Sequence, residues 1–285
     1  MDPRLHFEEH PGDGPPMLFV HGFLSSRAQW RENVGPLAAV CRPVVVELWG
    51  HGRSPAGRTP RDYSAAGYLE QFEAIRERLG TERWYLCGQS LGASLTLRYS
   101  LAFPERVIAQ VFTNSNSAFA TAEIILERRR LAAAAIEDIE ARGLAAVEDL
   151  PVHPRGARRL PPGLHEELVT DAGRIDPRAV ADSYRHLNVD VSVREAARNI
   201  SVPTMMVCGS YEKRFAPHRD YAQSNVPGLR VVDLPAGHAV NAQRHEEFNT
   251  AVAAFLHAAT VESHDVGDAR EPGQGPPPVR SAADD

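Results

Sequence analysis

The stretch W-Y-L-C-G-Q-S-L-G, residues 84–92, decides the fold. Its first four residues form an apolar run of strand length, and residues 91–103 have helical spacing. A G-x-S-x-G pattern arises by chance in roughly one chain in ten of this length, so the flanking strand and helix give it meaning. A sharp strand-to-helix turn strains the serine backbone, and side chains at positions 88 and 92 would clash with neighbouring elements. The stretch therefore predicts a nucleophile elbow that lifts the Ser90 hydroxyl above a sheet.

Apolar runs alternate with amphipathic stretches along most of the chain. The runs that favour strands are 17–20, 44–46, 84–87, 107–112, 202–207 and 229–234. The stretches that favour helices are 27–39, 64–79, 91–103 and 242–258. Near-continuous apolar strands that alternate with helices are typical of a parallel sheet covered on both faces. We therefore predict an α/β fold with a mostly parallel central sheet, helices on both faces and a helical cap insertion.

The regular alternation stops between residues 115 and 199, and this break sets the predicted domain boundaries. That segment has a helical pattern, is rich in Ala and Arg, and is interrupted by prolines. We expect residues 1–114 and 200–262 to form the core and residues 115–199 to form a helical cap above it. Residues 263–285 are rich in Pro, Gly, Asp and Ala without apolar periodicity, which predicts a disordered tail.

The composition excludes several classes of protein. Of the 285 residues 43% are hydrophobic and 24% charged, and the formal net charge is -6, so nothing indicates affinity for nucleic acid or for an anionic membrane. No apolar run has the length of a membrane span, and the N-terminus lacks the features of a signal peptide, which predicts a cytoplasmic protein. Three widely spaced cysteines, Cys41, Cys87 and Cys208, favour buried free thiols over disulfides or a zinc site.

Two other loops at strand ends carry candidate catalytic groups. His21-Gly22-Phe23 directly follows the first apolar run, so the Phe23 N–H can serve as an oxyanion donor beside the Leu91 N–H at the start of the predicted helix. Loop chemistry of this kind is carried by the backbone, so we interpret His21 as structural. Gly237-His238 follows the last predicted strand, where a side chain points into the crevice in which such sheets bind ligands. His238 is therefore the candidate general base.

A histidine base needs a buried carboxylate to fix its tautomer and stabilise its charged form. Glu212, in the sequence G-S-Y-E after the fifth predicted strand, is the best candidate. The other common position follows the fourth strand, where Asn114-Ser115-Asn116-Ser117 contains no carboxylate. Asp220 is a weaker alternative, since the pattern puts it within the following helix.

The order of the motifs along the chain resembles that of the α/β-hydrolase superfamily: H-G-F, G-Q-S-L-G, G-S-Y-E and then G-H. Residues 47–54 (E-L-W-G-H-G-R-S) are also similar to the D-x-x-G-x-G-x-S turn of that superfamily. The resemblance covers about residues 15–258. It implies an α/β-hydrolase fold, a triad of Ser90, Glu212 and His238, oxyanion donors at Phe23 and Leu91, and a cap at residues 115–199. Glutamate replaces the usual aspartate at position 212, which requires the backbone to lie about one methylene further from the histidine.

The resemblance also ranks the possible reactions. Serine at position 90 excludes the epoxide hydrolases and haloalkane dehalogenases of the superfamily, which need an aspartate there. The leading hypothesis is a serine hydrolase of a small-molecule ester, lactone or thioester, with an acyl-enzyme, no metal or organic cofactor, and an ascending pH limb near neutrality. Carbon–carbon hydrolysis of a diketone-like acid ranks lower, because Phe23-Leu24-Ser25-Ser26 replaces the glycine-rich stretch usual in those enzymes. The alternative of another class is a non-catalytic ligand-binding protein.

The substrate contacts are open at this level. Gln89, Asn114 and Arg214 are candidates by position, because each lies beside a predicted catalytic loop. The arginines of the cap suggest recognition of an anionic substrate, against the alternative that they are solvated on helix faces. We expect a small-molecule substrate, without nucleic acid or membrane, and the sequence favours no particular oligomeric state. The basic residues concerned are Arg128, Arg129, Arg130, Arg155, Arg158 and Arg159 of the cap, with Lys213 and Arg214, which directly follow the proposed acid.

Overall fold

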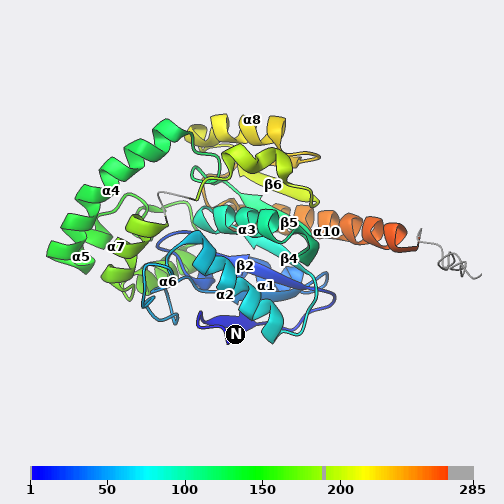
Figure 1. Cartoon of the computed structure of the whole chain (residues 1–285), viewed down its shortest axis with the longest axis horizontal. Coiled ribbons are helices and arrows are strands. Elements are labelled where there is room, and N and C mark those ends of the chain that lie inside the picture. The colour runs from blue at the N-terminus through cyan, green and yellow to red at the C-terminus, as the bar shows by residue number, and fades with distance from the viewer. Residues whose placement is uncertain (1, 188–190, 269–285) are drawn as a thin grey trace, which may run out of the picture.

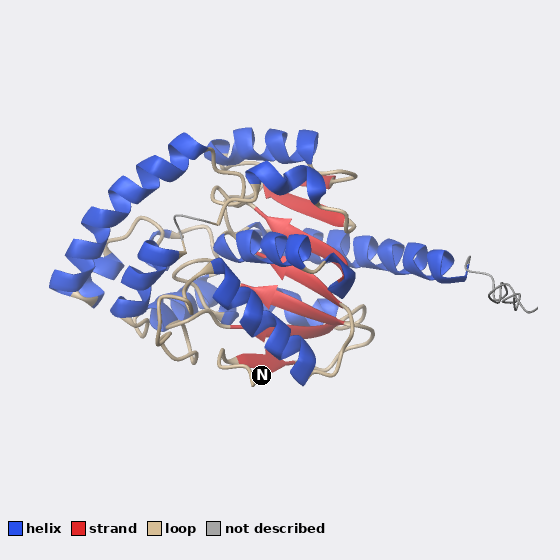
Figure 2. Cartoon of the chain, viewed as in Figure 1, coloured by secondary structure: helices blue, strands red, loops and turns tan. Residues whose placement is uncertain are grey.

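A computed structural model describes residues 2–187 and 191–268, with side chains described as far as residue 260. Its centre is a seven-stranded sheet in the order β1-β3-β2-β4-β5-β6-β7 (Figures 1 and 2). Short β1 pairs antiparallel with β3, and every other neighbouring pair is parallel. The predicted mostly parallel α/β sheet is confirmed. The strands are β1 (Phe7–Glu9), β2 (Pro16–Val20), β3 (Arg42–Val46), β4 (Trp84–Gly88), β5 (Val107–Thr113), β6 (Thr204–Gly209) and β7 (Arg230–Leu234).

Helices cover both faces of the sheet because the strands are apolar on both faces. Leu18 and Val20 of β2 belong to the hydrophobic cluster that also contains residues of α2, α3 and α8. The alternate residues Met17 and Phe19 pack in a second cluster with α1, α9 and α10. The period of two along β2 thus divides the core into two layers. These helices are α1 (Arg31–Leu37), α2 (Ala65–Arg78), α3 (Leu91–Ala102), α8 (Ala216–Asn225), α9 (Val240–Gln243) and α10 (His245–Asp268).

Four further helices lie between β5 and β6 in sequence and are called the inserted helices below. They gather at one end of the sheet (Figure 1). Leu24, just beyond the carboxyl end of β2, is buried in a cluster with Ile139 and Val180 of these helices, so they lie at the end where the parallel strands finish. The inserted helices are α4 (Ala122–Arg142), α5 (Leu144–Glu148), α6 (Pro162–Ala172) and α7 (Pro177–His186).

Two boundaries differ from the sequence-based expectation. The predicted helix at 27–39 is a 3-10 turn, η1 (Arg27–Trp30), followed by the short α1. The closing helix α10 continues to Asp268, so the predicted tail does not begin at residue 263. The first glycine after residue 260 is Gly267 and the first proline is Pro272, so no helix breaker occurs earlier. The remainder of that prediction, residues 269–285, lies outside the described residues.

Two other expectations can be compared with the structure. Cys41, Cys87 and Cys208 are buried free thiols, as predicted. Within residues 2–187 and 191–268, no helix combines the length and the apolar character needed to cross a membrane. The remaining short helices are η2 (Pro104–Arg106), η3 (Pro154–Gly156), η4 (Arg194–Asn199) and η5 (Lys213–Phe215).

Candidate active site

Ser90 occupies a strained turn between β4 and α3. Its backbone has φ 54° and ψ -114°, a left-handed conformation that residues with a side chain rarely adopt. The two glycines of the motif explain how the turn fits: a β-carbon on Gly92 would overlap the carbonyl oxygen of Val20, and one on Gly88 would lie 2.5 Å from the carbonyl oxygen of Gly92. Such strain costs about 1–3 kcal/mol and persists only where the surroundings enforce it. Ser90 is half-buried, whereas its neighbours Gln89 and Leu91 are buried.

The loop after β2 packs directly on this serine. A β-carbon added to Gly22 would lie 2.3 Å from Gln89 Oε1 and 3.1 Å from the β-carbon of Ser90, so a side chain there would force a shift. Leu24 has φ 56° and reverses the chain at this point, with Ser25 N–H donating to Gly22 O. Leu91 is the first residue of α3, so its N–H has no acceptor within its own helix. The N–H groups of Phe23 and Leu91 therefore belong to the two segments that flank Ser90.

Two buried histidines hold the loop after β2 in place. His21 Nε2 accepts from Leu48 N–H (3.1 Å), so Nδ1 carries the proton and donates to Gly22 O (2.7 Å). His51 Nε2 accepts from Leu24 N–H (3.2 Å), and its Nδ1 donates to Trp49 O (2.8 Å). Burial lowers the pKa of His21 to about 4 and that of His51 to about 3, so both are neutral at neutral pH. The structural interpretation of His21 agrees with this geometry.

The turn at residues 47–54 supplies the second of these histidines, which sequence reasoning did not assign. Glu47 is fully buried, and its carboxylate accepts from Arg53 N–H (2.7 Å). Gly52, at φ 54°, lies against that carboxylate so closely that a β-carbon would overlap it. The turn is thereby folded back beneath the loop after β2, and His51 is aimed at Leu24. The G-H-G sequence around His51 is the signal that could have identified this role.

Glu212 and His238 meet at the ends of β6 and β7. His238 Nδ1 lies 2.8 Å from Glu212 Oε2, and the two side chains are 42% and 18% exposed. This hydrogen bond fixes the proton on Nδ1 and leaves Nε2 as the nitrogen that can accept another. The glutamate side chain, one methylene longer than the usual aspartate, therefore reaches the histidine. Gln89 Nε2, next to Ser90, reaches His238 O at 3.5 Å, which links the base loop to the elbow.

Two asparagine side chains hold the glutamate. Asn114 Nδ2 donates to Glu212 Oε2 (2.7 Å), and Asn116 Nδ2 donates to Glu212 Oε1 (2.8 Å). Burial by itself raises the pKa of Glu212, but the hydrogen bonds from His238 and the two asparagines outweigh it and hold the pKa below its ordinary value. Glu212 is thus ionised beside His238. Asp220, the weaker alternative, lies in α8, is 70% exposed and pairs with Arg219 (3.1 Å).

The three candidate substrate contacts have different surroundings from those expected. Asn114 is fully buried, and besides Glu212 it bonds Gly209 N–H and Gly209 O, so its side chain positions the acid and does not face a substrate. Gln89 is 4% exposed and joins the elbow to the base loop. Arg214 in η5 is exposed, and no ion pair or hydrogen bond of its guanidinium is found within residues 2–187 and 191–260. Position along the chain identified the neighbourhood of these residues but not the direction of their side chains.

The arginines of the inserted segment fall into two groups. Arg130 and Arg155 are bound to exposed carboxylates of their own segment, as solvated helix faces would be. Arg128 is half-buried and donates to Asn116 O (3.0 Å), and burial lowers the pKa of its guanidinium. Arg159 lies beside the loop that carries His238, since its Nη1 would be 3.5 Å from a β-carbon on Gly237. Only the second group approaches the candidate site.

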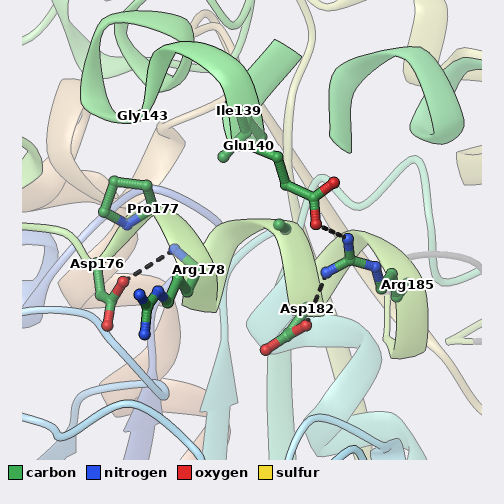
Figure 3. A pocket seen from close by; sticks show the side chains of 9 residues that line it. Ile139, Glu140, Gly143, Asp176, Pro177, Arg178, Asp182 and Arg185 are labelled. Atoms are coloured by element: carbon green, nitrogen blue, oxygen red, sulfur yellow. Dashed lines mark hydrogen bonds and ion pairs between the residues drawn. The ribbon is translucent and has the colours of Figure 1, made fainter. Parts of the chain in front are cut away.

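A depression of about 500 Å³ lies on the inserted helices themselves, between the end of α4 and α7 (Figure 3). Its lining is mostly charged, and Arg185 bridges Glu140 and Asp182 across it. None of the lining residues is a candidate catalytic residue. This depression is therefore separate from the Ser90 site.

The comparisons with known proteins agree with this architecture. The family model described as "alpha/beta hydrolase fold" matches residues 15–132. A putative 2-succinyl-6-hydroxy-2,4-cyclohexadiene-1-carboxylate synthase of Bacillus subtilis is 23% identical over 256 residues, which cover 87% of this chain and 93% of the relative. An uncharacterized carboxylesterase of the same organism, nap, is 25% identical over 256 residues, which cover 88% of this chain and 82% of the relative.

The solved structures show the same fold. MenH from S. aureus has a TM-score of 0.79 at 18% identity, covering 90% of this chain and 99% of that one. A thermophilic esterase from Thermogutta terrifontis has a TM-score of 0.75 at 22% identity, covering 90% and 93%. The sheet order, with a strained serine between a central strand and its helix, defines an α/β protein of the nucleophile-elbow type. This chain has the α/β-hydrolase fold.

Proposed function

We propose that this chain is a serine hydrolase of small-molecule carboxylic esters, including lactones and thioesters, with Ser90 as nucleophile, His238 as general base and Glu212 as the orienting acid. The observation that carries the proposal is the 2.8 Å hydrogen bond between His238 and an ionised Glu212, at strand ends next to the Ser90 elbow. Relatives named as carboxylesterases, which align over most of the chain, support the same class of reaction.

The proposed reaction has two halves. The Ser90 hydroxyl oxygen attacks the acyl carbon while its proton passes to His238 Nε2, and the N–H groups of Phe23 and Leu91 stabilise the oxyanion. The tetrahedral adduct then expels the alcohol or thiol, which takes the proton from His238, and leaves an acyl ester on Ser90. Water, deprotonated by His238, attacks this ester, and the second tetrahedral adduct releases the acid while Ser90 Oγ takes the proton back from His238. Glu212 stabilises the imidazolium in both halves.

The inserted segment, residues 115–199, is proposed as the cap of the site. Three contacts support this: the Phe23 ring meets Tyr184 of α7 edge-on at 5.3 Å, Ser26 Oγ donates to Asp171 of α6 (2.6 Å), and a β-carbon on Gly50 would overlap Ala179. All three core residues belong to the loops after β2 and β3. The segment would therefore select substrates, while the loops at the strand ends perform the chemistry.

Labelling with a fluorophosphonate probe tests the nucleophile. We expect wild-type protein and the matched control Ser210→Ala, which removes an exposed serine after β6, to be labelled equally. Ser90→Ala should not be labelled and should lose about 10⁴-fold or more in kcat on p-nitrophenyl esters, because the remaining groups cannot form an acyl-enzyme. His238→Ala should label far more slowly.

The outcomes separate the competing functions. Full labelling or turnover by folded Ser90→Ala would exclude Ser90 as the nucleophile. An activated serine without ester turnover would favour carbon–carbon hydrolysis of a diketone-like acid by the same three residues. A folded wild-type protein that is neither labelled nor active would favour a non-catalytic binding protein.

A further inference from the structure

Arg159 of the inserted segment is held beside the acid and base loops by its neighbour in sequence. Leu160 is only 7% exposed and packs in a cluster with Ala28 of η1, Leu164 of α6 and Ala242 of α9. Ala239, the residue after His238, packs against the same cluster. The backbone at position 159 is therefore fixed against the element that carries the candidate base, unlike an arginine on a free helix face.

The guanidinium of Arg159 lies between the two loops. Its Nη1 would be 3.5 Å from a β-carbon on Gly237, directly before His238, and its Cζ is 5.7 Å from the Tyr211 ring centre, directly before Glu212. Both neighbours are fixed: Gly237 N–H donates to Gln243 Oε1 (2.6 Å), and Tyr211 N–H donates to Ala236 O (2.8 Å). The Tyr211 ring is 55% exposed, so the ring and the cation form an accessible surface at the edge of the site.

The charge of Arg159 has no counterion among the side chains of residues 2–187 and 191–260. Arg155 and Arg142 of the same segment are paired with Asp149 (2.8 Å) and Asp138 (2.9 Å), whereas the adjacent Arg158, like Arg159, has no ion pair among the described side chains. An aromatic face steadies a guanidinium without neutralising it, so the planar fork remains able to bind a carboxylate with two hydrogen bonds.

We propose that Arg159, backed by Tyr211, binds a carboxylate carried by the substrate next to His238, so that the enzyme prefers acid-bearing esters. This inference rests on the proposed hydrolase function, because the preference is measured on the ester bond cleaved at Ser90. It narrows the anionic-substrate hypothesis from seven arginines to one whose neighbours are those of the catalytic loops.

Two esters of equal chain length test the preference. Mono-p-nitrophenyl adipate carries a terminal carboxylate, and p-nitrophenyl hexanoate lacks it. We expect Arg159→Gln to lower kcat/KM for the adipate half-ester about tenfold and to change that for hexanoate by no more than about twofold. Arg158→Gln, which removes the adjacent exposed arginine, is the matched control and should leave both values unchanged. Arg159→Lys should retain part of the preference, because it keeps the charge but loses the fork.

Equal effects of Arg159→Gln on the two esters would overturn the inference and leave the hydrolase function intact. If the wild-type protein cleaves neither ester, the proposed function fails, and calorimetric titration with adipate then tests the subsite alone. Binding to wild type that is about tenfold weaker in Arg159→Gln, and unchanged in Arg158→Gln, would support the subsite. Absent binding, or equal binding to wild type and Arg159→Gln, would refute it.

Discussion

The loops at the strand ends and the inserted helices both carry many polar residues, but they use them in opposite ways. In the loops, Glu47, His21 and His51 are buried, and each has defined hydrogen-bond partners. On the inserted helices, pairs such as Arg130–Glu127 lie in solvent, with side chains 71% and 53% exposed. Buried partners fix a geometry, whereas exposed ion pairs contribute little and leave the side chains replaceable. Substitutions should therefore have very different effects in the two regions.

The largest effect is expected on kcat, from substitution of a candidate catalytic residue in the loops at the strand ends. Glu212→Gln keeps the shape of the side chain but removes the charge that stabilises the His238 imidazolium, so we expect kcat on an ester substrate to fall about 10³-fold. Asp220→Asn, the matched control in α8, should leave kcat within about twofold of wild type. Steady-state kinetics with p-nitrophenyl esters measure both. A normal rate for Glu212→Gln together with a slow Asp220→Asn would move the acid to α8.

The same contrast explains how much of the site could be predicted from the sequence. In a parallel sheet the carboxyl ends of the strands meet at one edge, so residues that directly follow strands are neighbours in space whatever their separation in the chain. That rule predicts Ser90, Glu212 and His238 as neighbours; in the structure His238 bonds Glu212, and Gln89, next to Ser90, reaches His238 O. It gives positions but not side-chain directions, and for this reason Asn114 was interpreted as a substrate contact when it holds Glu212.

The inserted helices could be predicted only as helices. An Ala- and Arg-rich pattern indicates secondary structure, but the face that an arginine occupies depends on how the helices pack on the core. The same holds for the turns between the helices: Arg155 of η3 and Arg159 of the turn before α6 are four residues apart, yet one pairs with Asp149 and the other lies beside Gly237. The packing of Leu160 decides this difference, and it is a tertiary contact. The end of α10 was also missed, because composition suggested a tail before the first helix breaker.

A second effect, on stability, is expected from the buried histidines. The pKa of His21 is about 4 and that of His51 about 3 in the folded protein, against about 6.5 when unfolded. Between pH 6.5 and 4 the unfolded chain therefore binds more protons, and the free energy of unfolding should fall as the pH is lowered, by about 3 kcal/mol for each histidine. Urea unfolding at pH 7 and pH 4.5 measures this loss.

Variants identify the source of that pH dependence. His51→Gln can still accept from Leu24 N–H but cannot titrate, so the loss of stability on acidification should be smaller than in wild type. His257→Gln, which replaces an exposed histidine of α10, should reproduce the wild-type loss. If the pH dependence of His51→Gln equals that of wild type, the His51 ring does not stay neutral in the folded protein. Its hydrogen bond from Leu24 N–H would then not explain how the loop after β2 is held.

The smallest effect is expected on the outer surface of the inserted helices, at the depression in Figure 3. Arg185→Gln breaks the ion pairs of Arg185 with Glu140 and Asp182, but all three side chains are solvent-accessible. We therefore expect the free energy of unfolding to change by less than about 1 kcal/mol and ester turnover to be unchanged. Ile139→Ala, which truncates the buried side chain next to Glu140 in α4, should cost about 3 kcal/mol because Ile139 is only 2% exposed. Thermal melts and kinetics on the two variants compare the faces of one helical layer. A loss of turnover in a stable Arg185→Gln would show that this depression takes part in function.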